Sequence, residues 1–259
     1  MVFICGIHIF DKSLKDAVNL VVEECLNSNL KTPKLISARD AHGIVISKKD
    51  KNFHKILSSF DINLPDGVPI VWIGRLKGSK EMGRCSGVDF FQEIMITTKD
   101  KNIKHFLCGG KEGVPEKLKM VCEKKFGNKN IVGTYSPPFR DMSEEEIKIL
   151  SNQINSLGAD IVWVGLSTPK QEVFAYRLSK YLKVKFICTV GAAFDFHTGR
   201  VKRAPKFMQN IGLEWLYRLI KEPKRLFKRY AVVVPMFIYY AAVDLIKDYF
   251  RFYSCNRGW

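Results

Sequence analysis

The stretch Ile161-Val162-Trp163-Val164-Gly165-Leu166-Ser167-Thr168-Pro169-Lys170 has the pattern of a buried strand, a turn and the start of a helix. Its first four residues are continuously apolar, as in parallel strands that helices cover on both faces. A Ser/Thr pair followed by proline is typical of a helix N-terminus. Phe186–Val190 is nearly as apolar as the first run. We therefore expect a parallel sheet with helices packed on both of its faces.

The same alternation of β-rich runs and amphipathic segments continues over about two hundred residues, which favours an α/β fold. Glu146 stands three residues after Ser143, and this spacing predicts a helix capping box. The pattern predicts strands at Val2–Ile9, Lys34–Ser37, Asp61–Leu64, Lys104–Cys108, Asn130–Thr134, Asp160–Gly165 and Val184–Val190. It predicts helices at Ser13–Asn27, Val68–Leu76, Gly113–Lys125, Ser143–Ser156 and Thr168–Leu182.

Composition narrows the class of protein and the kind of partner. The chain has 259 residues, 46% of them hydrophobic, which is enough for a real core. Its net charge of +16 indicates an anionic partner: nucleic acid, a phosphorylated small molecule or an anionic membrane. Seven cysteines without a CxxC pair suggest neither a disulfide framework nor a zinc site, and they fit a reducing cytosol. The apolar start Met1–Phe10 lacks a cationic region, so we interpret it as a first strand, not a signal peptide.

The composition changes near residue 200. Arg200–Arg229 holds ten Lys/Arg against two acidic residues, Glu214 and Glu222. Tyr230–Val243, which follows, carries no charge and is marginal in length for spanning a bilayer. We favour an interfacial or re-entrant helix beside anionic lipid headgroups, with a single span and an oligomer-core helix as alternatives. We thus predict a catalytic domain at 1–205 and a basic, then apolar, helical appendage at 206–259.

Polar residues at the ends of two early strands are candidates for chemistry. Asp66, in Leu64-Pro65-Asp66-Gly67, follows an apolar strand, and its carboxylate is expected at the ligand-binding edge of the sheet. The alternative is that Asp66 only caps the next helix. Ser37, Arg39, Asp40 and His42 end an earlier strand and are expected near the same cleft, although a lone histidine is more often structural.

Three later strand ends, together with Asp40 of the earlier one, offer candidates for binding a ligand. Gly109 and Gly110 let backbone amides approach a phosphate, or else form a plain turn. Lys170 suits a phosphate, and Gln171, with Glu172 beside it, suits a base or sugar. Asp195 is either a sugar ligand or a turn former.

Seven short motifs occur in order along the chain: PDG at 65–67, GRCSGVDFF at 83–91, LCGGKEGV at 107–114, GLSTPKQE at 165–172, VGAAFDFHTG at 190–199, RAP at 203–205 and GLEWLYRLIKEPKR at 212–225. Taken together, they resemble the WecG/TagA/CpsF family of bacterial glycosyltransferases over residues 4 to 229. The resemblance implies a Rossmann-like fold with a C-terminal appendage. It also implies transfer of a sugar, of the N-acetylmannosamine type or glucose, from a UDP donor to a membrane-borne polyprenyl-diphosphate-linked sugar. Inversion at the anomeric carbon without an obligate metal or other cofactor is implied as well.

The chain departs from the family pattern at two nearby positions. Many members have Thr-x-Asn near the first motif, where this chain has Ser37-Ala38-Arg39. These changes leave the identity of the donor sugar open, whereas Asp66 keeps its PDG context.

The resemblance implies a mechanism in which Asp66 is the general base, with Ser37 and Arg84 beside it as catalytic residues. The sequence has no DxD, HExxH, GxSxG or Walker A pattern, so fixed cations are expected to stabilise the departing diphosphate. Arg218, Arg225 and Arg229 are spaced by seven and four residues, so a continuous helix, unless Pro223 kinks it, would align them. Binding of lipid headgroups or simple solvation is the alternative for each of these arginines.

Two other classes of function compete with this one. An NAD-dependent nucleotide-sugar epimerase or dehydrogenase would need a GxGxxG motif with an acidic ribose ligand, which the chain lacks. A non-enzymatic basic module would bind membrane or nucleic acid, but no recognised nucleic-acid motif is present. We therefore expect an enzyme at the cytoplasmic face of the cell membrane, with no nucleic-acid partner and with a homo-oligomer possible.

Overall fold

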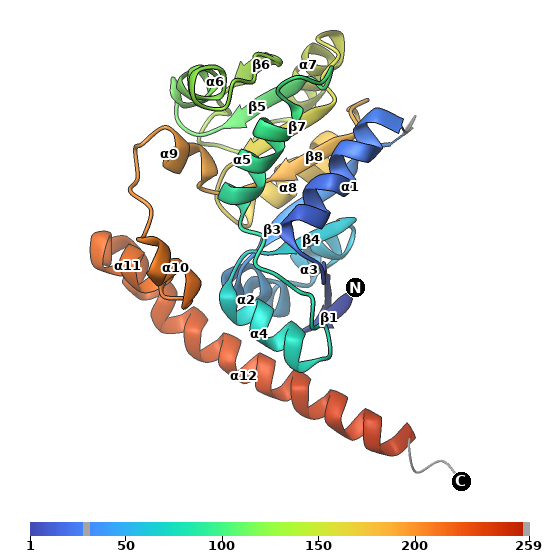
Figure 1. The fold of residues 1–259 in the computed structure, drawn as a ribbon, viewed down its shortest axis with the longest axis vertical. Coiled ribbons are helices and arrows are strands. Elements are labelled where there is room, and N and C mark those ends of the chain that lie inside the picture. The colour runs from blue at the N-terminus through green and yellow to red at the C-terminus, as the bar shows by residue number, and fades with distance from the viewer. Residues whose placement is uncertain (28–31, 256–259) are drawn as a thin grey trace.

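The computed structural model describes residues 1–27 and 32–255, and its centre is a six-stranded parallel sheet (Figure 1). The strand order is β4-β3-β8-β7-β5-β6, and each neighbouring pair is parallel. This confirms the α/β prediction and its six internal strands. Their bounds are β3 Lys34–Arg39, β4 Ile62–Pro65, β5 His105–Gly109, β6 Ile131–Tyr135, β7 Ile161–Gly165 and β8 Phe186–Thr189.

Helices cover both faces of the sheet, so every residue of the central strands β7 and β8 is buried. Trp163 of β7 packs with Phe91 of α5 on one face, and Val162 packs with Leu178 of α8 on the other. The first face carries α1 Leu14–Asn27, α5 Gly87–Thr98, α6 Val114–Lys125 and α9 Ala193–His197. The second carries α7 Glu144–Ser156 and α8 Lys170–Ser179.

The predicted capping box at the start of α7 is present. The Glu146 amide donates to Ser143 Oγ (3.2 Å), and the Ser143 amide donates to Glu146 Oε2 (2.7 Å). Two backbone N–H groups at the start of the helix are thereby hydrogen-bonded by side chains only three residues away.

The prediction of one strand over Val2–Ile9 is wrong. The segment forms a hairpin of β1 Val2–Ile4 and β2 Ile7–Ile9, which pair antiparallel outside the main sheet. Cys5 and Gly6 both have positive φ angles (52° and 83°), the geometry of a tight two-residue hairpin turn. The hairpin joins a third core with α2 Ala41–Lys49, α3 Lys51–Ser58 and α4 Val68–Leu76.

The C-terminal appendage consists of α10 Lys206–Asn210, α11 Glu214–Lys221 and α12 Pro223–Cys255. In Figure 1, α12 runs as one long helix past α2 and α4. Val233, Phe237 and Ala241 of α12 are buried in the third core, so one face of this helix is docked on the catalytic body.

The expectation that one helix aligns three arginines is wrong. Helix α11 ends at Lys221, Glu222 leaves helical geometry (φ −134°, ψ 57°), and Pro223 begins α12. Proline suits a first helical position because its nitrogen has no hydrogen to donate and its φ is fixed. The chain therefore turns between Arg218 and Arg225.

Within the described residues, one segment, Pro223–Phe250, is long and apolar enough to cross a membrane by length and composition. Only 17% of its most apolar window is buried inside the protein. The segment therefore has one docked face and a larger exposed face.

Candidate active site

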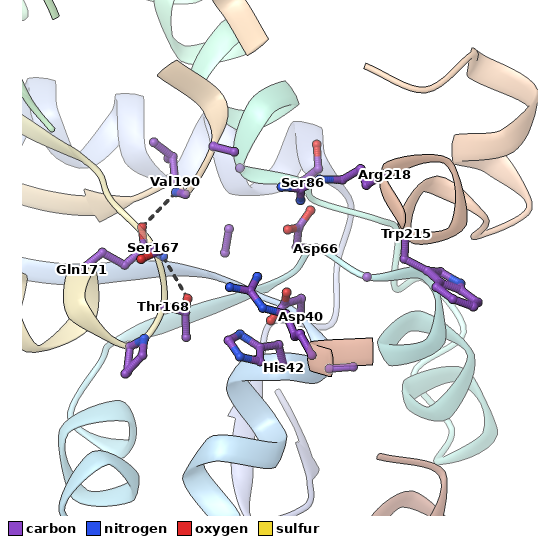
Figure 2. Close-up of a pocket in the computed structure, with 18 of the residues that line it drawn as sticks. Asp40, His42, Asp66, Ser86, Ser167, Thr168, Gln171, Val190, Trp215 and Arg218 are labelled. Atoms are coloured by element: carbon purple, nitrogen blue, oxygen red, sulfur yellow. Dashed lines mark hydrogen bonds between the residues drawn. The ribbon is translucent and has the colours of Figure 1, made fainter. Parts of the chain in front are cut away.

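A large cavity opens at the edge of the sheet where the parallel strands end. Its volume is about 1440 Å³, and it is lined by the loops that follow β3, β4, β5, β7 and β8 and by residues of α11 and α12. In Figure 2, Asp66 and His42 lie across the cavity from Gln171, and Arg218 approaches from α11. Open α/β sheets bind their ligands at this edge. We therefore take this cavity as the candidate active site.

Asp66 lies at the cavity wall, directly after β4. Its amide donates to the carbonyl of Arg39 (2.9 Å), which continues the pairing of β3 and β4 by one residue. Gly67, not Asp66, is the N-cap of α4, and that cap has no side-chain hydrogen bond. The capping alternative for Asp66 is thus not what the structure shows, and its carboxylate is available to a ligand.

The environment of Asp66 suits a proton acceptor. Its side chain is 33% exposed, but that surface faces the recessed cavity, and burial raises the pKa of the carboxyl to about 6. The Arg84 guanidinium opposes this rise in pKa, and the negative charges of Asp40 and Glu214 add to it. A carboxyl with such a pKa is ionised at neutral pH and is a stronger base than an ordinary aspartate.

Arg84 joins Asp66 to the appendage. Its Nε donates to the Asp66 carbonyl (2.6 Å), and its Nη2 lies 3.8 Å from Asp66 Oδ1. The same Nη2 donates to Glu214 Oε2 of α11 (2.6 Å). Arg203 approaches the other oxygen of Glu214 (3.6 Å) and is held at Asp89 (2.5 Å).

Sequence reasoning assigned no role to Arg203 or Glu214, although both lie inside matched motifs, RAP and GLEW. Their position in those motifs is the signal that could have found them. In the structure they tie the start of the appendage to the wall that carries Asp66.

Ser37 and Glu172 are placed differently from the expected ligand contacts. Both side chains are fully buried beneath the cavity, and neither lines it. Glu172 Oε1 pairs with the fully buried Arg39 (3.1 Å), and Ser37 Oγ donates to the same oxygen (3.3 Å) and accepts from Arg39. Charged side chains that are buried away from water, as Arg39 and Glu172 are, need an opposite charge and hydrogen bonds to stabilise them. We correct the expectation of direct contact for these two residues.

Gln171 lines the cavity, but its amide is already used. Its Oε1 accepts from the Gly191 amide (2.9 Å), and its Nε2 donates to Glu172 Oε1 (2.9 Å) and toward Thr168 Oγ1 (3.3 Å). Paired readout of a base or sugar by this amide is therefore not what the structure offers. Gln171 instead joins the loops after β7 and β8.

Gly109, the last residue of β5, and Gly110, which follows it, allow the ends of β5 and β7 to lie close together. A Cβ on Gly109, whose φ is +146°, would stand 2.5 Å from the Gly165 carbonyl oxygen. The Gly110 amide donates to that same oxygen (2.9 Å) and so does not point at a phosphate. The plain-turn interpretation fits this geometry, and Gly109 does not line the cavity whereas Gly110 does.

Three other expected donor-site residues do line the cavity. Lys170 is exposed at the first position of α8. Asp40 caps α2 by accepting from the Gly43 amide (2.9 Å), and Asp195 pairs with Arg200 (3.5 Å). His42 also lines the cavity, and burial lowers its pKa, so the ring is neutral at pH 7.

Arg218, Arg225 and Arg229 all line the cavity although they belong to two helices. The Arg218 guanidinium lies over the Phe196 ring (5.7 Å), and its Nε is buried without a hydrogen-bond partner. Arg225 pairs with Glu222 (2.6 Å). Among the residues that the structure describes, Arg218 and Arg229 have no ion-pair partner. The turn between α11 and α12 therefore leaves positive charge free at the cavity.

In the described part of the chain, no group of three or more His, Cys, Asp or Glu side chains could hold a metal ion. Six cysteines there are buried and free.

Two comparisons with known proteins agree with this geometry. The chain is 32% identical over 177 residues to an N-acetylglucosaminyldiphosphoundecaprenol N-acetyl-beta-D-mannosaminyltransferase of Bacillus subtilis (strain 168), covering 68% of this chain and 67% of that protein. Residues 2–251 match the Glycosyl transferase WecG/TagA/CpsF family. The chain therefore belongs to the WecG/TagA/CpsF family and is a glycosyltransferase.

Proposed function

We propose that this enzyme transfers a sugar, of the N-acetylmannosamine type, glucose or a related kind, from a UDP donor to a polyprenyl-diphosphate-linked sugar. The product would belong to a surface polysaccharide or wall polymer. The name of the Bacillus subtilis relative supports this substrate class. The observation that carries the proposal is the partly buried Asp66 carboxylate, whose pKa is raised and which faces a cavity that unpaired arginines of the appendage also line.

The proposed chemistry is a single displacement. A sugar hydroxyl of the acceptor is a poor nucleophile at neutral pH, so Asp66 takes its proton while the new C–O bond forms. The bond from the anomeric carbon to the UDP oxygen breaks as the new bond forms on the opposite face, and the anomeric centre is inverted. No covalent intermediate, and hence no second carboxylate acting as nucleophile, is needed.

The departing diphosphate gains negative charge, which preorganised cations stabilise most effectively. Arg218 is suited to this task because it makes no ion pair with an acidic side chain among the described residues, and Arg229, which is also unpaired there, adds positive charge from α12. Arg84 is less free, since Glu214 and Asp66 share its charge, and we assign it to holding the base. The buried Arg39–Glu172 pair holds the turn after β7, which carries Thr168, and the start of α8, which carries Gln171.

We place the enzyme at the cytoplasmic face of the cell membrane, with 1–205 as the catalytic unit and 206–259 as the membrane-associating appendage. Beside the docked stripe, α12 exposes apolar side chains to solvent. Cationic and apolar residues on one exposed surface favour binding to anionic lipid. The exposed apolar side chains outside the cavity include Val232, Tyr239 and Ile246, which are 47%, 63% and 54% exposed.

The membrane proposal is tested by substitution, because deleting the helix would also remove Val233, Phe237 and Ala241 from the core. Changing Val232, Tyr239 and Ile246 together to serine should lower binding to anionic vesicles about tenfold in co-sedimentation, since apolar burial is lost. Ile149→Ser, at an equally apolar exposed site on α7, is the matched control and should not alter binding. Unchanged co-sedimentation of the triple variant would place the membrane contact elsewhere.

The pH dependence should report Asp66. Because burial raises its pKa to about 6, the base is protonated and inactive below that pH and ionised above it. We expect kcat/KM to rise with pH through an inflection near 6 and to level off toward pH 7.5. Initial rates in constant-ionic-strength buffers measure this. An inflection near 4, where an ordinary aspartate titrates, would contradict the proposed environment.

Activity should persist when EDTA is present, with a loss of less than about twofold, since arginines can supply the charge that a metal would otherwise bring. Initial rates before and after EDTA treatment, and after adding Mg²⁺ or Mn²⁺ back, measure this. A complete loss that a metal restores would show that the cationic leaving-group mechanism is wrong.

The proposal as a whole is tested by offering a panel of UDP-sugars with a short-chain polyprenyl-diphosphate-sugar acceptor. The mass of the product identifies both the reaction class and the donor. No product of added hexose or N-acetylhexosamine mass with any donor would contradict the proposal.

A further inference from the structure

We propose that a groove between α4 and α12 binds the first isoprenoid units of the acceptor's polyprenyl chain. This inference rests on the function proposed above and assigns a place to the lipid part of its substrate. The groove is an extension of the active-site cavity, because one continuous set of lining residues includes both.

The two walls of the groove are apolar faces of two helices. On α4 the lining residues recur at helical spacing, at Val68, Trp72 and Leu76. On α12 they recur in the same way, and the set includes Val234, Ile238, Ala242 and Leu245. Spacings of three and four residues place such side chains on one face of a helix. The groove therefore presents hydrocarbon from both sides.

These side chains line the cavity and yet remain accessible. Trp72 is 54% exposed, Leu76 is 73% exposed and Ile238 is 62% exposed. Large apolar side chains grouped on one exposed surface are uncommon in monomeric soluble proteins and mark binding sites. The protein itself does not cover this surface within the residues described.

The order of charge along α12 matches the order of groups in the acceptor. Arg225 and Arg229 line the cavity from the first turns of α12, and the apolar lining begins at Tyr230 and Val233 and continues to Leu245. From Val233 to Leu245 the helix rises about 18 Å. A polyprenyl diphosphate has the same sequence of groups, with anionic phosphates followed by a linear hydrocarbon.

The walls are fixed relative to each other before any ligand arrives. Lys77, at the C-terminal end of α4, pairs with both Asp244 and Asp248 of α12, each at 2.6 Å. The Asp244 carboxylate also accepts from the Cys5 amide (2.8 Å). A groove held in this way binds its ligand without the cost of ordering the walls.

Charge distinguishes a lipid from a protein as the occupant. The groove begins at Arg225 and Arg229 of α12, and Arg229 has no ion-pair partner among the described residues. An apolar helix of a second copy would cover the hydrocarbon and leave that cation unpaired. An amphiphile with an anionic head satisfies both parts at once, while Arg218 of α11 remains for the departing UDP.

The test compares two acceptors that share the sugar and the diphosphate but differ in chain length, one with a long polyprenyl chain and one with a single short alkyl group. Assays in detergent remove membrane partitioning from the measurement. For the full-length protein we expect Ile238→Ser and the groove-filling Ala242→Trp to raise the KM of the long-chain acceptor about tenfold. The KM values of the short-chain acceptor and of the nucleotide sugar should not change.

Two serine variants serve as controls. Ile149→Ser, at an exposed position of α7 that does not line the cavity, should leave both acceptor KM values unchanged. Ile246→Ser lies on α12 but does not line the cavity, so it should weaken vesicle binding without altering the KM in detergent. An equal effect of Ile246→Ser and Ile238→Ser on the long-chain KM would overturn the groove and assign the effect to general lipid contact.

Failure of the groove and failure of the proposed function give different results. If the unaltered enzyme uses both acceptors with equal KM, the groove proposal is wrong and the transferase proposal stands. If it uses neither acceptor with any donor, the proposed function itself is wrong. A change of oligomeric state in Ala242→Trp by light scattering, without a change in the long-chain KM, would instead assign the groove to a second copy and overturn the proposal.

Discussion

Replacing Asp66 by asparagine should lower kcat by at least about a hundredfold while leaving the affinity for the nucleotide sugar nearly unchanged. Asparagine has the same shape as aspartate but cannot accept the hydroxyl proton. The donor is expected to contact other walls of the cavity, so its binding does not depend on the Asp66 charge. Turnover is measured at saturating substrates, and donor affinity is measured by calorimetry with the acceptor absent.

Folding is not expected to confound this variant. Burial disfavours the ionised form of Asp66, as its raised pKa shows, so a neutral amide at this position should not lower the melting temperature at pH 7.5. Asp141→Asn is the matched control, because Asp141 also lines the cavity but lies on the loop after β6. We expect less than about threefold loss for that variant, the scale of a minor change in uniform binding. Near-normal turnover of Asp66→Asn would reject Asp66 as the base.

The sequence was sufficient to predict the sheet and the position of the proposed base. Both depend on local patterns: continuous apolar runs mark strands covered on both faces, and a residue directly after such a strand lies at the carboxyl edge. Asp66 follows its strand immediately, and it lines the cavity as expected.

The role of Ser37 could not be predicted in this way. It lies two residues before the end of β3, where strand geometry points it into the layer beneath the cavity. Its neighbours there are Arg39 and Glu172, the second of which is 135 residues away in sequence. The pairing of two charges across such a separation has no local signature. Arg39 and Glu172 meet only because β3 and β7 both pair with β8, which brings the end of β3 next to the start of α8.

The N-terminal hairpin and the break before α12 differ in how predictable they were. Cys5-Gly6 is not one of the common hairpin dipeptides, so the short apolar runs on either side of it look like one strand. Pro223, by contrast, is a strong signal for a new helix. Treating it as a start instead of a kink would have predicted that Arg218 and Arg229 approach the cavity from two directions.

Because Arg218 and Arg229 both line the cavity, we expect a second large loss in kcat from the variant Arg218→Ala. Arg218 is the better placed of the two unpaired arginines, because Phe196 holds its guanidinium and its buried Nε has no partner in the described structure. Loss of one preorganised donor to a developing anion typically costs about 10² to 10³ in kcat. We expect a loss on that scale, measured in detergent with the short-chain acceptor so that lipid headgroups do not contribute.

Two comparisons separate stabilisation of the leaving group from a simple loss of positive charge at the cavity. Arg140 also lines the cavity, but Glu146 holds it through two hydrogen bonds (2.7 and 2.6 Å), so Arg140→Ala should change kcat less than about threefold. Guanidinium ion added to Arg218→Ala should restore part of the lost rate, because the space between Phe196 and the cavity then accepts the missing group. If instead Arg218→Ala raises the donor KM and leaves kcat unchanged, the arginine binds the diphosphate equally in the ground state and the transition state. Stabilisation of the departing charge would then have to come from Arg229, whose alanine variant would show the loss in kcat.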